Sequence, residues 1–139
     1  MKIQIAESKE DILKCREVLF ELRRDLDKIN FLSVIEEMIQ EGYKLAFIEE
    51  GGRAVAAVGF RYVQFLYNGK HYYIDDLSTL PGYRGRGLAG QLLDYVADQA
   101  RNNGFRCVTL DSGYQRYDAH RLYLNKGFTL NCHHFSKLV

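Results

Sequence analysis

The spacing of hydrophobic residues changes partway along the chain, and each spacing predicts a different kind of element. Between positions 12 and 29, apolar side chains recur every three or four residues, which predicts an amphipathic helix that starts just after Ser8. The same spacing from Phe31 predicts a shorter helix that Gly42 ends. From Tyr43 onward the period changes to two, which is typical of β-strands.

Turn signals divide the rest of the chain into short strands and two further helices. Asn68-Gly69, between two strand-like runs, is a strong hairpin signal, and Pro81-Gly82 ends the returning strand. This order predicts one mixed α/β (α+β) domain over residues 1–139, with six or seven strands and about four helices. Strands are expected at 3–5, 45–48, 54–65, 71–80, 106–111, 128–130 and 135–138, and the later helices at 88–100 and 118–126.

Composition narrows the class of protein. A chain of 139 residues with 47% hydrophobic and 27% charged side chains can form a core without a disulfide or a metal. Nineteen Lys and Arg against 18 Asp and Glu leave a net charge of +1, which argues against a nucleic-acid or anionic-membrane partner. No apolar run is long enough for a transmembrane helix and no signal-peptide pattern is present, so we expect a cytoplasmic protein. The three cysteines lack metal-ligand spacing and predict no metal site.

A glycine-rich turn at 82–90 carries the clearest chemical signal. Glycines allow a ligand to approach the backbone closely, and the first turn of the following helix offers unpaired N–H groups to an anion. Two arginines add positive charge, so the turn predicts a phosphate or pyrophosphate cradle; the alternative is a tight turn with solvated arginines. The candidate binding residues are Arg84, Gly85, Arg86, Gly87, Leu88, Ala89 and Gly90.

The glycine spacing also matches a dinucleotide-binding fingerprint. Gly85, Gly87 and Gly90 fit G-x-G-x-x-G, and Asp111 lies at about the distance expected for a ribose contact. That fingerprint belongs to the first strand and helix of a parallel sheet, whereas this turn follows a hairpin strand. The chain after Asp111 is also too short for the rest of a doubly wound sheet, so the dinucleotide interpretation is disfavoured.

Two segments resemble signatures of the GNAT (Gcn5-related) N-acetyltransferases. Residues 77–89 resemble the acetyl-CoA signature Q/R-x-x-G-x-G/A, carried here by Arg84, Gly87 and Ala89, and residues 119–128 are similar to the family's A-x-x-x-Y-x-x-x-G-F segment. The resemblance spans most of the chain and is thinnest at its start. It implies the GNAT fold: a central, mostly antiparallel mixed sheet with a splayed pair of parallel strands, expected here at 71–80 and 106–111.

The resemblance also implies how acetyl-CoA would bind. The pantetheine arm would lie between the splayed strands and pair with the backbone of Leu77, Ser78 and Thr79, while the pyrophosphate would lie on amides from Arg84 to Gly90. Many relatives carry Asn seven residues before the conserved tyrosine, where this chain has Arg116. At this pantetheine contact the chain therefore departs from the family pattern.

Acetyl transfer to an amine needs a proton for the departing thiolate and an acceptor for the amine proton. Tyr123 matches the family's general acid; the alternative is a half-buried aromatic packed on a helix face. Asp75 is the candidate base or holder of a cationic amine, with Asp76 as the second choice and a solvated sheet face as the alternative. Because neighbouring strand residues face opposite sides, at most one of these acids is expected to point into the cleft. His120 shares the helix of Tyr123 and is expected to be structural.

These features together predict an N-acetyltransferase that uses acetyl-CoA as co-substrate and transfers the acetyl group directly to an amine. Cys107 and Cys132 have no obvious base beside them, which disfavours a covalent enzyme intermediate. A non-catalytic acyl-CoA sensor or interaction module is the alternative. The acceptor is expected to be a small-molecule or protein amine. The chain after Phe128 is short, which leaves the acceptor side open or completed by a second subunit in a homodimer.

Overall fold

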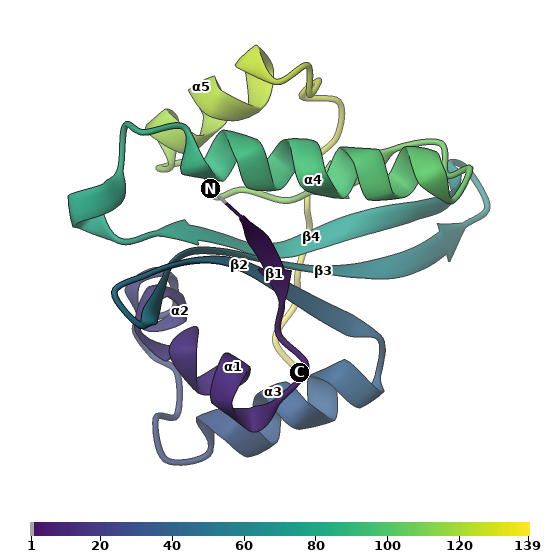
Figure 1. The fold of residues 1–139 in the computed structure, drawn as a ribbon. Helices are drawn as coiled ribbons and strands as arrows, with labels where there is room; N and C mark the ends of the chain where they lie inside the picture. Colours follow the sequence, from purple (N-terminus) through teal and green to yellow (C-terminus); the bar gives the residue numbers. More distant parts are fainter. Residues whose placement is uncertain (1) are drawn as a thin grey trace.

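The computed structural model describes residues 2–139, and within them five strands pair in the order in which they occur along the chain (Figure 1). The strands are β1 (Ile3–Ile5), β2 (Tyr43–Glu50), β3 (Arg53–Phe65), β4 (Gly69–Thr79) and β5 (Val108–Leu110). The helices are α1 (Lys9–Lys14), α2 (Arg16–Leu22), α3 (Phe31–Gln40), α4 (Leu88–Asn102) and α5 (Tyr117–Asn125), with a short 3₁₀ turn, η1, at Pro81–Tyr83.

The sheet is mixed, as predicted. β1 to β4 pair antiparallel in succession, and β5 alone runs parallel to its neighbour β4. Helices α1, α2 and α3 cover one face of the sheet, and α4 and α5 lie on the other (Figure 1). The connection from β4 through α4 to β5 is the crossover that a parallel pair requires.

The core lies on both faces of the central strands. On the α4 face, Phe60 of β3 packs edge-on against Tyr72 of β4, with ring centroids 5.0 Å apart, and Phe105 contacts the same tyrosine at 5.0 Å. On the other face, Phe20 and Phe31 join α2 to α3 with centroids 5.2 Å apart. Strands covered on both faces are apolar throughout, which is why the run in β2 and β3 is nearly continuous rather than alternating.

The first helical region is broken, although one helix was predicted. Its start is confirmed, because Ser8 accepts a hydrogen bond from the backbone N–H of Asp11 at 3.1 Å. The helix is interrupted at Cys15, and α2 ends at Leu22. Beyond it the carboxylate of Asp27 accepts hydrogen bonds from the backbone of the residues two and three positions later, which favours a loop over a further helical turn.

The expected count of six or seven strands is wrong. Residues 128–130 and 135–138 form no strand, and the predicted strand at 106–111 is reduced to β5. The end of the chain leaves the sheet instead of returning along β5, so that its backbone finds no ladder partner within residues 2–139 (Figure 1). Among the described helices, none combines the length and the apolar character that a membrane crossing demands.

Candidate active site

β4 and β5 separate halfway along β4. They pair only where Tyr72, Tyr73 and Ile74 lie beside the three residues of β5. β4 then continues to Thr79 with β3 as its only strand partner in residues 2–139. The fork holds a hollow of about 220 Å³, lined by Leu22, Arg23, Ile74, Asp75, Leu77, Leu110, Asp111, Ser112, Gly113, Gln115, Arg116 and Tyr123. The predicted splay of the parallel pair is therefore present.

A β-bulge lies at the point of separation. Gly59 of β3 pairs with Asp76 and the next residue, Phe60, pairs with Ile74, so that Asp75 is the extra residue on β4. A bulge bends its strand and increases the local twist. The bend lies directly after Ile74, the last residue of β4 that pairs with β5. The bulge therefore explains why the two strands separate at this point.

The bulge also breaks the alternation expected for the two aspartates. Asp75 accepts hydrogen bonds from Arg61 through Nε at 3.0 Å and Nη2 at 2.7 Å. Asp76 accepts from the hydroxyl of Tyr43 at 2.8 Å, and the guanidinium of Arg61 stacks over that same tyrosine ring at 5.4 Å. Both carboxylates therefore gather around the same two side chains, on the face that α1 to α3 cover. Only Asp75 also lines the hollow.

The ring of Tyr43 occupies the space that a side chain at position 59 would need. A Cβ atom there would lie 1.8 Å from the Tyr43 hydroxyl, so only glycine is accommodated at that position. Burial, and secondarily the carboxylate of Asp76, raises the pKa of Tyr43 well above its ordinary value. The tyrosine therefore stays protonated and donates to Asp76. A second donor, Nε of Arg23 in the loop after α2, contacts Asp76 at 3.0 Å.

Tyr123 reaches the fork from α5, and the end of that helix explains its spacing from Gly127 and Phe128. The N–H of Phe128 donates to the carbonyl of Tyr123 at 3.0 Å, and the N–H of Gly127 to that of Leu124 at 3.1 Å. Gly127 has φ +90°, which completes a Schellman motif. The rings of Tyr123 and Phe128, 5.9 Å apart, make the hydrophobic contact that accompanies this motif. The spacing Y-x-x-x-G-F thus fixes the helix end that holds Tyr123.

Burial raises the pKa of Tyr123 above its ordinary value, although the nearby Arg116 guanidinium acts in the opposite direction. The phenol is therefore a proton donor at neutral pH. Its ring borders the same hollow as Asp75, which lies across the fork on β4. The structure brings these two predicted residues to one hollow, and Asp76 does not line it.

The open edge of β4 presents backbone groups to the fork. The N–H of Leu80 donates to the carbonyl of Val55 on β3. Because the backbone N–H and C=O groups of successive residues alternate between the two edges of a strand, those of Leu77 and Thr79 point toward the open side. The hydroxyl of Thr79 is also buried, with no hydrogen-bond partner in residues 2–139. An extended ligand carrying amide groups fits such an edge, because it would add to the sheet as a strand does.

The glycine-rich turn has the conformation that the sequence predicted. Gly85 and Gly87 have φ of +77° and +78°, values that favour glycine, and α4 begins directly after Gly87. The N–H groups of the first turn, Leu88, Ala89 and Gly90, have no acceptor within the helix and can bind an anion. Gly90 has a second role, because a Cβ atom there would lie 2.9 Å from Cε of Lys126, at the end of α5.

The two arginines of the turn fold back on the backbone around it. Arg84 donates through Nε to the carbonyl of Thr79 at 3.2 Å, at the end of the open edge. Arg86 donates to the carbonyl of Gly82 at 3.3 Å and stacks over the Tyr83 ring at 4.9 Å. Arg84 also lies 3.4 Å from the carboxylate of Glu21 on α2, which offsets part of the positive charge that the two arginines bring to the turn.

Several residues around the fork were not singled out from the sequence. Arg23, Tyr43 and Arg61 come from three separate elements and carry no motif, so that only the fold brings them to the two aspartates. Burial, together with the hydrogen bond that the Tyr73 hydroxyl donates to Asp111 of the fork at 2.9 Å, raises the pKa of that tyrosine to about 12. His120, expected to be structural, lies with Nε2 3.1 Å from the hydroxyl of Ser112 in the loop before α5.

The chain matches known proteins along most of its length. The model of the Acetyltransferase (GNAT) family matches residues 10–128. An uncharacterized N-acetyltransferase of Bacillus subtilis, YhdJ, is 38% identical over 134 residues, which cover 95% of this chain and 94% of that protein. The aminoalkylphosphonate N-acetyltransferase of Salmonella typhimurium is 35% identical over 66 residues, 48% of this chain and 43% of the enzyme.

Solved structures share the fold at lower identity. A putative acetyltransferase from Agrobacterium tumefaciens superposes with a TM-score of 0.85 at 21% identity, over all of both chains. An aminoglycoside N-acetyltransferase crystallised with CoA superposes with a TM-score of 0.84 at 17% identity, over 99% of this chain and 95% of the enzyme.

Proposed function

The chain belongs to the GNAT family of acetyltransferases, and we propose that it acts as a single domain that transfers an acetyl group from acetyl-CoA directly to an amine. The observation that carries this proposal is the fork itself. An open strand edge and a half-buried phenol border one hollow between β4 and β5, and the helix N-terminus of α4 follows the end of that strand edge along the chain. Those features correspond to the three parts of the reaction, which are an extended thioester arm, its pyrophosphate and a leaving thiolate.

In this proposal acetyl-CoA would supply the activated acyl group as a thioester. Leu77 and Thr79 hold the pantetheine arm through their outward backbone groups, with Ser78 between them, and the unpaired hydroxyl of Thr79 gains a partner. The pyrophosphate lies on the N–H groups between Arg84 and Gly90, where the α4 dipole and two guanidinium groups favour negative charge. Arg116, at the fork, takes the place of the asparagine common in the family.

Tyr123 is proposed as the general acid. The amine nitrogen attacks the thioester carbonyl, the C–N bond forms, the C–S bond breaks, and the phenol gives its proton to the departing thiolate. A phenol whose pKa is raised by burial is protonated at neutral pH, as this role requires. The phenolate is then reprotonated from solvent.

Asp75 is proposed to bind the amine and accept its proton, and Asp76 to stabilise the bulge in β4. Asp75 lines the hollow, so its carboxylate can attract a cationic amine and take up the amine proton through a water molecule. Asp76 does not line the hollow; it accepts hydrogen bonds from Arg23 and Tyr43 and is assigned to the bulge. The acceptor is proposed to be a small-molecule or protein amine; the aminoalkylphosphonate and aminoglycoside enzymes among the similar proteins are named for small amines.

Calorimetric titration of acetyl-CoA tests the cradle. Wild type is expected to bind with a micromolar dissociation constant, and Gly87→Glu to lose binding, because the variant adds a side chain at positive φ and a negative charge at the pyrophosphate position. Gly104→Glu is the matched control: it places the same residue at φ +71° at the opposite end of α4, and it should bind like wild type. No binding by wild type, or equal loss in both variants, would overturn the proposal.

Thiol release in the presence of an amine panel tests the chemistry. Tyr123→Phe is expected to lower turnover at least about a hundredfold, the size of a general-acid contribution, with acetyl-CoA affinity unchanged. Tyr117→Phe, an exposed tyrosine on the same helix, serves as the control and should retain full turnover. Equal turnover in wild type and Tyr123→Phe would remove Tyr123 from the mechanism.

A non-catalytic acyl-CoA sensor is the second candidate function. One observation favours it: both aspartates accept hydrogen bonds from cationic side chains, so neither is a free carboxylate. Such a sensor would bind acetyl-CoA as above but release no thiol with any amine of a broad panel. Amine-dependent thiol release that Tyr123→Phe abolishes would exclude it.

A further inference from the structure

The hollow at the fork is lined by charged side chains of both signs. Asp75 of β4 and Asp111, which directly follows β5, supply negative charge, and Arg23 and Arg116 supply positive charge. A ligand is selected by how well its own charges complement those that the site offers. The charges that decide this selection are the ones that the protein itself leaves uncompensated.

Two of the four charges are already paired inside the protein. The guanidinium of Arg61 contacts the carboxylate of Asp75, with Nη2 at 2.7 Å. The guanidinium of Arg23 contacts the carboxylate of Asp76, with Nε at 3.0 Å. Asp75 and Arg23 are therefore each compensated by a group of opposite charge.

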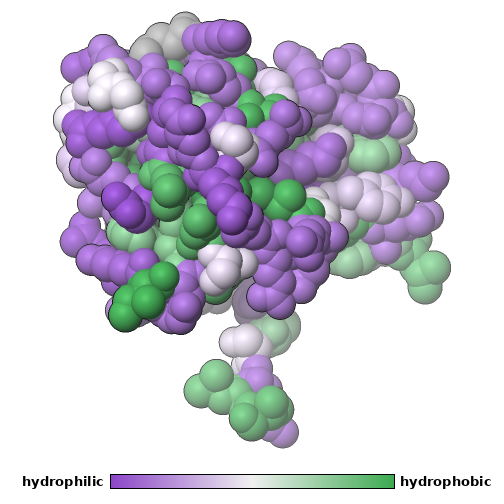
Figure 2. Space-filling view, turned by 60° about the horizontal axis from the view of Figure 1, so that its bottom comes forward, coloured by the Kyte–Doolittle hydropathy of each residue, from purple (hydrophilic) through white to green (hydrophobic). Residues whose placement is uncertain are grey.

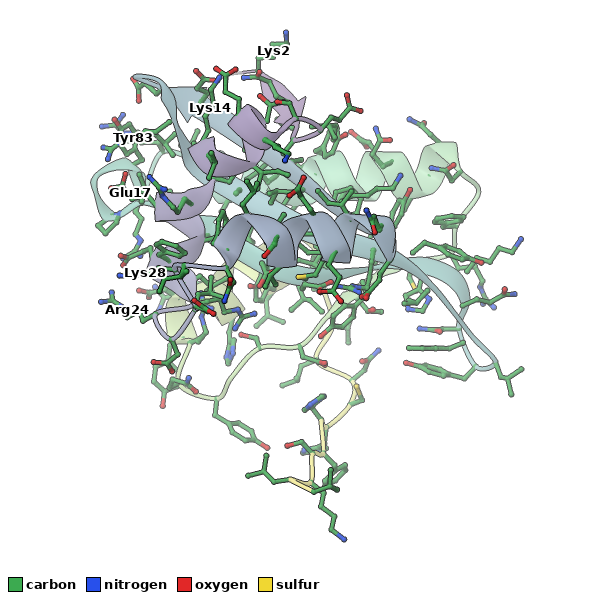
Figure 3. All side chains as sticks on the ribbon, turned by 90° about the horizontal axis from the view of Figure 1, so that it is seen from below. Lys2, Lys14, Glu17, Arg24, Lys28 and Tyr83 are labelled. Carbon is green, nitrogen blue, oxygen red and sulfur yellow. The ribbon has the colours of Figure 1, made fainter. Side chains whose placement is uncertain are left out.

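Two further cations follow Arg23 in the chain, and both are also engaged. Arg24 pairs with Glu21 at 3.0 Å. The Nζ atom of Lys28 lies 5.4 Å from the centroid of the Phe20 ring. Both cations lie beyond the end of α2 (Figure 3), and neither lines the hollow. They therefore leave Arg116 as the cation that a ligand in the hollow would meet unpaired.

Arg116 forms no ion pair with any carboxylate of residues 2–139. Its backbone is fixed, because its N–H donates to the carbonyl of Gly113 at 3.1 Å and its carbonyl accepts from the N–H of His120 at 3.0 Å. The guanidinium acts to lower the pKa of Tyr123 against the effect of burial. The uncompensated positive charge therefore lies near the proposed general acid.

Asp111 is the negative counterpart of Arg116. The Tyr73 hydroxyl and His134 Nδ1 both contact its Oδ2, at 2.9 and 3.2 Å, so Oδ1 has no partner in the described part of the chain. The phenol is neutral, and His134 belongs to the end of the chain that projects from the body (yellow in Figure 3, at the bottom of Figure 2). Asp111 and Arg116 are five positions apart on one loop and do not pair with each other.

We propose that the acceptor is a small zwitterionic amine, which carries a carboxylate or phosphonate group that binds Arg116 while its amine nitrogen lies beside Asp75 and Asp111. A guanidinium binds such a group through paired N–H···O bonds, which give the contact direction as well as strength. This inference rests on the proposed function and selects among the amines that it admits. A polyamine or an aminoglycoside is disfavoured, because it brings several positive charges to an unpaired guanidinium.

Thiol release from acetyl-CoA with matched pairs of amines is the first test. The standard amino acids, β-alanine and 2-aminoethylphosphonate are each compared with the amide or, for the phosphonate, the diethyl ester, which keeps the amine and removes the negative charge. At least one anionic amine should give a kcat/KM at least about tenfold above that of its uncharged partner, the size of a charge-assisted hydrogen bond. The uncharged partner has the less basic amine and more of it is unprotonated at neutral pH, so amine reactivity cannot produce this preference.

The same panel separates this inference from the proposed function. Equal kcat/KM within every pair, or spermidine as the best acceptor, would overturn the zwitterion proposal and leave the acetyltransferase assignment standing. Thiol release with no amine at all would overturn the proposed function, and this inference with it.

Replacement of Arg116 tests its role directly. Arg116→Asn, which introduces the residue common in the family, should raise the KM of the preferred anionic amine at least about tenfold and bring the kcat/KM ratio of its pair close to one. Arg116→Lys should restore part of the ratio, because the charge remains while the paired geometry is lost. Arg121→Asn is the matched control: it removes the same charge from an exposed position on α5 and should keep the wild-type ratio. An unchanged ratio in Arg116→Asn, or a calorimetric Kd for acetyl-CoA that rises as much as the acceptor KM, would contradict the proposal.

Discussion

The two halves of β4 differ in almost every physical respect. From Tyr72 to Ile74 the strand has neighbours on both edges, and its apolar side chains pack against β3 and α4. From Asp75 to Thr79 it has one strand neighbour in residues 2–139, two acidic side chains and a buried hydroxyl without a partner there. The closed half is paired and packed as the core of a folded protein is. The open half leaves polar groups without hydrogen-bond partners, which a protein core would supply. Unpaired groups beside a hollow are a cost in the free protein that a ligand can recover.

At the boundary between the halves, one buried side chain, Tyr43, packs against the backbone of the bulge. Tyr43 lies where a side chain at Gly59 would be, and its hydroxyl reaches the carboxylate after the bulge. The predictions below each alter one part of that arrangement, in order of expected size.

Gly59→Ala should have the largest effect. The added methyl group collides with the buried Tyr43 ring, so the ring must leave its place and the bulge loses its support. We expect the free energy of unfolding to fall by about 3 kcal/mol in urea titrations, and acetyl-CoA affinity to fall with it. Gly82→Ala is the control, since nothing lies within 4 Å of a Cβ at Gly82. If Gly59→Ala keeps wild-type stability, Tyr43 does not hold the bulge.

Replacing each aspartate by alanine in turn should show that Asp76 acts mainly on stability and Asp75 mainly on turnover. Asp76→Ala leaves the buried hydroxyl of Tyr43 without an acceptor and is expected to cost about 2 kcal/mol of stability. Asp75→Ala, at the hollow, should cost about half as much stability but lower amine-dependent turnover at least about tenfold. Urea titration and thiol release on the same preparations measure both. A larger loss of stability in Asp75→Ala and a larger loss of turnover in Asp76→Ala would contradict the roles assigned to the two residues.

Tyr43→Phe should have the smallest effect, and one that depends on pH. The pKa of Tyr43 is raised in the folded protein above its ordinary value of 10, so the stability it confers is fully present below pH 10 and is lost as the pH rises further. The variant should lose about 1 kcal/mol at neutral pH. Its unfolding free energy should then fall less steeply than that of wild type in alkaline buffer. Parallel alkaline slopes would show that Tyr43 titrates alike in both states.

The closed half and the binding turn could be predicted from sequence because local signals determine them. Asn68-Gly69 fixes the hairpin, Gly85 and Gly87 require positive φ, and the spacing from Tyr123 to Phe128 matches a helix end. The family resemblance implied the splay, but the placement of the two aspartates in the open half could not be predicted, because alternation along β4 fails at a bulge beside Tyr43, which is distant in sequence. The strands at 128–130 and 135–138 were wrongly predicted for a similar reason: a strand-like pattern does not identify which edge it will join.

Hydrogen exchange along β4, with and without acetyl-CoA, tests the central claim that the open half is the binding edge. At a ligand concentration about a hundred times the dissociation constant, the amides of Leu77 and Thr79 should exchange about a hundredfold more slowly, because their N–H groups gain a partner. Those of Leu88 to Gly90 should slow with them, and NAD should have no such effect. Unchanged exchange at Leu77 and Thr79 under saturating acetyl-CoA would contradict the account.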